Sequence, residues 1–177
     1  LSRGLGDVYK RQLLVFLHEA ELIGFEDTQF NIHDTIITLI NADLSRANLS
    51  NALLSGANLR EANLRGANLR GANLDGAIFQ YASLDGANLS NANLIGAYLE
   101  QVDLSRVNLH GVTLSEADLN NANLRGVDLD SVDLSRTDLQ NANLSGAYLD
   151  GARLNFAQNL TQQQLNQVPI NQCEGTV

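Results

Sequence analysis

The sequence has a single cysteine, Cys173, and contains neither methionine nor tryptophan. One cysteine cannot form an intramolecular disulfide or a cysteine-based metal site, so neither can stabilise the fold. Aromatic residues make up only 5% of the chain, although apolar residues reach 44%. The apolar content consists largely of alanine and leucine at fixed intervals, which predicts a thin, regular core without large side chains.

Positive charge is also scarce. Eleven Lys and Arg residues stand against twenty Asp and Glu residues, which gives a formal net charge of −9. This balance argues against direct, non-specific binding to nucleic acids or anionic membranes, because both require basic side chains. The apolar run "LLVFL", residues 13–17, is too short to cross a bilayer. No membrane segment is visible, and we predict a cytoplasmic location.

The first residues do not resemble protein sequence selected for folding. "SRGLGDVYKRQ", residues 2–12, resembles the in-frame translation of a sequencing adaptor, and it contains Lys10, the only lysine of the chain. Segments of this kind are set aside before a fold is considered. We therefore expect residues 1–12 to be non-native, the native N-terminus to be missing, and the C-terminus to be open to truncation as well.

A five-residue period dominates the rest of the chain. In "EANLRGANLRGANLDGA", residues 61–77, Ala recurs every five residues with Leu two places after it, and the pattern runs without interruption over 42–156. We number the places one to five from the Ala position. The second place is mostly Asn or Asp, and the fifth is often Gly. Helices and straight strands have periods of 3.6 and 2, so neither keeps Ala and Leu on one side.

A short extended segment followed by a corner does keep the first and third places inside in every repeat. Such a chain winds as a solenoid in which successive coils stack. Glycine at the fifth place suits a corner that needs a positive φ. The periodicity therefore predicts an all-β solenoid with Ala and Leu in its interior.

The segments "ANLRG", "ANLDG", "ADLSR" and "ANLSG" resemble the A(D/N)LXX signature of the pentapeptide-repeat family. The resemblance implies a right-handed quadrilateral β-helix over 42–156, with four repeats per coil and about six coils. Residues twenty apart would then stack, so that Val107 lies over Val127 and Val112 over Val132. The Asn-rich, uninterrupted repeat is similar to that of cyanobacterial members, which suggests a bacterial origin.

The two ends of a solenoid need caps, because each exposes apolar core and unpaired backbone. We assign residues 13–41 to an N-terminal cap region and residues 157–177 to a C-terminal capping helix and tail. Thr161 suits the N-cap position, Gln164 completes a capping box, and Pro169 marks the stop. The pattern predicts a short helix over about 162–168.

No pattern in the sequence indicates catalysis. The three histidines form no metal-ligand spacing, and no phosphate-binding loop or nucleophile motif is present. We also expect a smooth rod without a concave pocket of the sort that enzymes use. The sequence thus predicts no catalytic, cofactor-binding or metal-binding residues and no cofactor. An active domain upstream of this sequence is the enzymatic alternative.

The outward residues are then the candidates for function. An exposed apolar group can mark a docking patch, and acidic residues of the later coils can imitate the charges of a DNA backbone. We predict a non-catalytic protein–protein interaction or scaffold module of unknown partner and oligomeric state. The alternative is a DNA-mimicking regulator of DNA gyrase, the activity of fluoroquinolone-resistance members of the family; a merely solvated surface also fits. The candidate surface residues are Ile78, Tyr81, Tyr98, Asp118, Asp130, Asp138 and Asp150.

Overall fold

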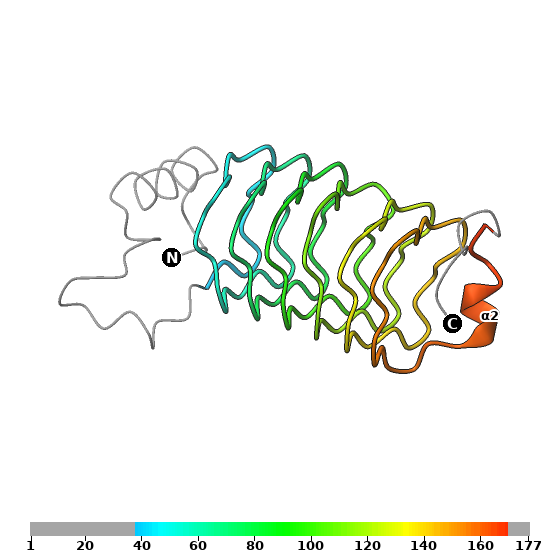
Figure 1. Cartoon of the computed structure of the whole chain (residues 1–177). Helices are drawn as coiled ribbons and strands as arrows, with labels where there is room; N and C mark the ends of the chain where they lie inside the picture. Colours follow the sequence, from blue (N-terminus) through cyan, green and yellow to red (C-terminus); the bar gives the residue numbers. More distant parts are fainter. Residues whose placement is uncertain (1–37, 170–177) are drawn as a thin grey trace.

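The computed structural model describes residues 38–169, which form coils stacked along one axis (Figure 1). Successive coils are joined by parallel bridges between residues twenty apart, from Thr38–Asn58 at one end to Asp138–Gln158 at the other. Each bridge is an isolated pair, because every side of a coil is too short for a longer strand. The twenty-residue register that the family resemblance implied is therefore present.

A tight turn ends each repeat. The backbone N–H of Ala47 donates to the carbonyl of Leu44 at 3.0 Å, and the same first-place to third-place bond recurs along the ladder. The fifth-place residue inside this turn adopts a positive φ in every repeat except the one that ends at Arg106, as a type II turn requires at its third position. Gly76 has φ 62°, but Arg46 and Tyr81 adopt the same conformation with φ 56° and 63°. The corner is thus imposed by the repeat and does not depend on glycine.

Four such turns in every twenty residues give each coil four sides. Each side is numbered by its first complete five-residue segment and includes every segment that follows that one at intervals of twenty residues. Side 1 begins with 42–46, side 2 with 47–51, side 3 with 52–56 and side 4 with 57–61. Sides 2 and 4 are opposite each other across the interior.

The interior is filled by the first-place and third-place side chains. Most of them are buried, and Phe79, the only third-place residue that is not leucine, is fully buried. Burial of each leucine stabilises the fold by about 1.5–3 kcal/mol. Thr137 is the polar exception at the first place, and its hydroxyl donates to the carbonyl of Leu134 at 2.8 Å or of Leu114 at 3.1 Å. The predicted Ala/Leu core is present.

Second-place Asn and Asp side chains form hydrogen bonds both with the corner of their own repeat and with the next coil. Asn48 Oδ1 accepts the backbone N–H of Ser50 at 3.3 Å and Nδ2 of Asn68 in the following coil at 3.1 Å. The first bond is the local turn that Asn and Asp favour. The second builds an amide ladder along the rod. This double use explains why the repeat prefers Asn and Asp at the second place.

The C-terminal end is covered by α2, Gln162–Leu165, at the red end of the chain in Figure 1. The predicted capping box is present: Thr161 Oγ1 accepts the N–H of Gln164, and Gln164 Oε1 accepts the N–H of Thr161. The helix is shorter than the predicted 162–168, since a turn follows at 166–167. The N–H of Gln167 donates to the carbonyl of Gln164, three residues back instead of four, so the helix ends before Pro169.

The side chain that closes the end of the rod is Gln164. Its Nε2 is buried and donates to the carbonyls of Leu139 and Ala142 at 2.7 and 3.0 Å. Val168 is buried beside it. The sequence identified Gln164 as a helix cap but gave no sign of this second role. Most of the predicted N-terminal cap, 13–37, lies outside the described residues, while Thr38–Asn41 already follow the ladder register.

Candidate interaction surface

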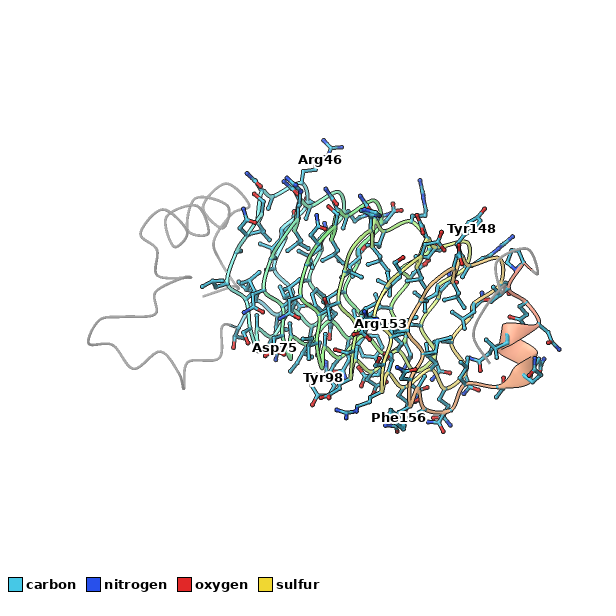
Figure 2. All side chains as sticks on the ribbon, in the orientation of Figure 1. Arg46, Asp75, Tyr98, Tyr148, Arg153 and Phe156 are labelled. Atoms are coloured by element: carbon cyan, nitrogen blue, oxygen red, sulfur yellow. The ribbon has the colours of Figure 1, made fainter. Side chains whose placement is uncertain are left out.

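The candidate surface residues divide between two opposite sides of the rod. Figure 2 shows Tyr98 of side 4 and Tyr148 of side 2 projecting from opposite edges in that view. The acidic residues proposed from the sequence therefore do not form one continuous patch. Ile78, Tyr98, Asp118 and Asp138 lie on side 4, Tyr81 lies at the corner that ends side 4, and Asp130 and Asp150 lie on side 2.

Side 4 carries four of these residues in one column. Parallel bridges join Ile78 to Tyr98, Tyr98 to Asp118, and Asp118 to Asp138. Tyr98 is 46% exposed and Tyr81 at the nearby corner is 61% exposed, whereas Ile78 is half-buried. An apolar stretch in the earlier coils is thus followed directly by an acidic stretch in the later coils.

Asp118 is the electrostatically strained member of this column. Burial raises the pKa of its carboxyl group, and the neighbouring carboxylates of Glu100 and Asp138 raise it further, against the effect of the Asn120 N–H. Glu100 lies in the fourth-place column of the same side, where its Oε1 accepts Nε2 of Gln80 at 2.8 Å. Its Oε2 is buried and has no hydrogen-bond partner.

The acidic pair on side 2 is arranged differently. Asp130 Oδ1 accepts the backbone N–H of Asp150 at 2.8 Å, so one of the two carboxylates is used to join coils. Both side chains are exposed fourth-place residues. Their environment is that of an ordinary solvated surface.

The bridge ladder is interrupted in the middle of the rod. Two bridges of the twenty-residue series, Ser83–Asp103 and Asn108–Asp128, are absent from the described ladder, together with the backbone bonds around them. The two gaps meet at Arg106, a fifth-place residue that lacks the positive φ of the corners around it. We call this interruption the seam. Its first part separates residues 81–86 from residues 100–105, and its second part separates residues 107–111 from residues 127–131.

The chain changes partners where it crosses the seam. Before Arg106 the backbone remains bonded to the following coil, through the N–H of Leu104 and the carbonyl of Asn123. After Arg106 it remains bonded to the preceding coil, through the N–H of Asn108 and the carbonyl of Ala87. Val107 and Val127 occupy the inward first place on the two edges of the second gap, but Val112 and Val132 hold the same relation beside the intact Thr113–Asp133 bridge, so a valine pair alone does not open the ladder.

An open cleft of about 520 Å³ lies over the first part of the seam. Within it, Asp85 is held between two guanidinium groups, with Arg65 at 3.3 Å and Arg106 at 3.2 Å. Tyr81 and Gln101 also line the cleft. The expectation of a smooth rod without a concave site is therefore wrong at this place, because the ladder is open there.

Asp103 at the same cleft is fixed by hydrogen bonds. The Ser105 hydroxyl donates to Asp103 Oδ1 at 2.6 Å, and Nδ2 of Asn123 donates to the same oxygen at 2.9 Å. The hydroxyl bond is the main cause that lowers the pKa of this carboxyl group. The acidic groups of the cleft are thus already bonded to neighbouring side chains.

In the described part of the chain, no three His, Cys, Asp or Glu side chains are grouped to hold a metal ion. No helix in residues 38–169 has the length and apolar character needed to cross a membrane.

Comparison with protein families agrees with this architecture. The family profile described as pentapeptide repeats matches residues 42–80, 82–121 and 117–155, in eight copies. This chain belongs to the pentapeptide-repeat family. Membership of this family implies a right-handed quadrilateral β-helix for it.

Several solved pentapeptide-repeat structures are similar to the chain. HetL, involved in heterocyst differentiation regulation in the cyanobacterium Nostoc sp. strain PCC 7120, is 36% identical with a TM-score of 0.64. The match covers 68% of this chain and 56% of HetL, so the chain spans little more than half the length of HetL. Comparison with curated protein sequences gave no match.

Two further structures show weaker likeness. The pentapeptide-repeat protein alr5209 from Nostoc PCC 7120 is 34% identical, with 63% of this chain and 84% of alr5209 covered and a TM-score of 0.29. Full-length QnrB1, a plasmid-mediated fluoroquinolone resistance protein, is 21% identical, with 76% and 74% covered and a TM-score of 0.36. At these TM-scores neither structure carries an argument about function.

Proposed function

We propose that this pentapeptide-repeat protein is a non-catalytic interaction or scaffold module that binds another protein through its outward side chains. The observation that carries the proposal is the bridge register, which sets second-place side chains into straight columns with one residue per coil. At a spacing of about 4.8 Å between coils, such columns make a fixed two-dimensional array on each side. A rigid array of this kind suits recognition of a partner surface, since few side chains need to be ordered on binding.

The alternative, a DNA-mimicking regulator of DNA gyrase, has less support. It rests on the net charge of −9 and on the acidic residues of the later coils. Asp118 and Asp138 lie on the side opposite Asp130 and Asp150, so these four carboxylates face different directions. The cytoplasmic location expected from the sequence remains a prediction.

Site-specific photo-crosslinking tests the proposed function. A photoreactive phenylalanine analogue would replace Tyr98 on side 4, Tyr148 on side 2 or Arg153 on side 3, all of which are exposed. Tyr98 and Tyr148 project from the rod in Figure 2. The full 177-residue chain would be irradiated in a lysate of Nostoc, the source of HetL. We expect one discrete crosslinked protein that depends on the labelled position and can be identified by mass spectrometry. Diffuse products that are the same at all three positions would contradict a binding module.

A further inference from the structure

The acidic half of side 4 has no positive charge of its own. The segments 97–101, 117–121 and 137–141 contain no Lys, Arg or His. The ion pairs within residues 38–169 involve Asp85 and Glu116, which lie on other sides. Glu100, Asp118 and Asp138 therefore stand close together without a cation.

The geometry of side 4 adds a second feature. Ile78 and Tyr98 continue the Asp118–Asp138 column toward the earlier coils, so the apolar and acidic parts share one line along the rod. At about 4.8 Å per coil, the four residues span about 14 Å. A segment of a partner protein can cover this length, and the flat side offers no obstacle from a protruding loop.

We propose that Ile78, Tyr98, Glu100, Asp118 and Asp138 form a docking surface for a protein segment that presents an apolar side chain next to basic side chains. This inference rests on the proposed function and names the side and the chemistry of the partner. Charge complementarity selects this occupant, because a cation beside the three carboxylates relieves their mutual repulsion. A nucleic acid is repelled by the same carboxylates, and a second copy of side 4 brings like charges together.

The contrast with side 2 makes the proposal specific. No apolar pair continues the Asp130–Asp150 column, because the preceding residues of that column are Ser90 and His110. The later coils of side 2 carry Asp128, Asp130 and Asp150, and side 4 carries Glu100, Asp118 and Asp138. On side 2 a single aromatic residue, Tyr148, follows Asp128 in its column, whereas on side 4 Ile78 and Tyr98 together precede the acidic residues. This pair of sides offers a control within one molecule.

Fluorescence anisotropy with three labelled synthetic peptides of twelve residues tests the proposal on the full chain. One peptide combines leucine and tyrosine with lysines, the second replaces each lysine by glutamate, and the third keeps the lysines but replaces leucine and tyrosine by serine. We expect binding of the first peptide alone, weakened about tenfold between 50 and 300 mM NaCl because surface charges are screened. Binding of the serine-containing peptide with equal strength would overturn the apolar part of the proposal, and no binding of the first peptide would overturn all of it.

Paired substitutions locate the surface. Asp118→Asn with Asp138→Asn, and separately Tyr98→Ala, should each weaken binding about fivefold or more. Asp130→Asn with Asp150→Asn makes the same change in net charge on side 2 and should change binding less than about twofold. Because Asn is the commonest second-place residue, the side 4 variant is expected to fold, which circular dichroism checks. Equal losses from both double variants would overturn the assignment to side 4. Failure of peptide binding with position-dependent crosslinking intact would reject this surface and leave the proposed function standing.

Discussion

Replacing Asp138 by asparagine should stabilise the protein. In the neighbouring columns an amide of one coil donates to the oxygen of the coil before it, as Asn123 Nδ2 does to Asp103 Oδ1 at 2.9 Å. Asp138 lies in the same relation to Asp118 but is a carboxylate, so at neutral pH it cannot donate and adds a like charge instead. Asp138→Asn supplies the missing donor and removes the repulsion. Asp138 Oδ1 accepts the Gln140 N–H and Asn159 Nδ2, and the amide oxygen of Asn can keep both bonds.

The size of the gain follows from two terms. A hydrogen bond of this kind contributes about 0.5–1.5 kcal/mol net. Two charges about 5 Å apart in a water-like medium repel by about 0.8 kcal/mol, and salt screening reduces that value. The expected increase in the free energy of unfolding is therefore about 1–2 kcal/mol, or about 2–8 °C in Tm for a chain of this size.

The gain should depend on pH with a definite sign. The pKa of Asp118 is raised in the folded protein above its ordinary value of 3.8. Ionised Asp118 therefore destabilises the fold at pH values above its folded pKa, and this destabilisation is lost as the pH falls below 3.8. The repulsive part of the Asp138→Asn gain should be present at pH 7 and disappear near pH 3, while part of the hydrogen-bond contribution persists.

The assay is thermal unfolding followed by circular dichroism at both pH values, with Asp75→Asn as the matched control. Asp75 is exposed on side 3, and its carboxylate makes no hydrogen bond or ion pair within residues 38–169. Its replacement changes the net charge equally and should leave Tm nearly unchanged. If Asp138→Asn is no more stable than Asp75→Asn at pH 7, the reasoning about the column is refuted.

Three further substitutions test the core, the seam and the cap. Leu94→Asp should abolish the cooperative unfolding transition seen by circular dichroism, because it removes about 1.5–3 kcal/mol of burial and places a charge in the interior. Arg106→Gly should favour the missing left-handed corner and slow amide hydrogen exchange on both edges of the seam. Arg136→Gly is the control and should leave this exchange unchanged, because its corner already has φ 59°. Equal exchange in both variants would show that residue 106 does not control the seam. Gln164→Ala should lower the free energy of unfolding measured in urea by about 1–3 kcal/mol, because the Ala142 carbonyl loses its side-chain donor and the Leu139 carbonyl keeps only the N–H of Ala142. Exposed Gln163→Ala serves as the control, and a similar loss there would contradict the capping role.

Much of the fold was predictable because each repeat solves the same local problem. The five-residue period placed Ala and Leu inside, and from Ala42 to Leu149 those positions are buried except for half-buried Ala47. The capping box of Thr161 and Gln164 was also visible, since it depends on residues three apart. The burial of Gln164 against Leu139 and Ala142 was not, because those carbonyls come from the coil that the helix covers.

The candidate surface was only partly predictable. Side chains twenty apart were expected to stack, and the bridges join Ile78 to Tyr98 and Asp118 to Asp138 as expected. The sequence drew attention to these acidic and apolar residues by their type. It did not reveal the buried, unpartnered oxygen of Glu100, because that depends on how neighbouring columns pack.

The sequence by itself determined the inward and outward positions and the five-residue corner, because these follow from short-range periodicity. Only the tertiary structure decided where that periodicity is interrupted. Arg46, Arg106 and Arg136 occupy the same place in the repeat, yet Arg46 and Arg136 have a positive φ and Arg106 does not. The difference cannot come from residue type. It lies in how whole coils stack, because the backbone before Arg106 bonds to the following coil and the backbone after Arg106 bonds to the preceding coil.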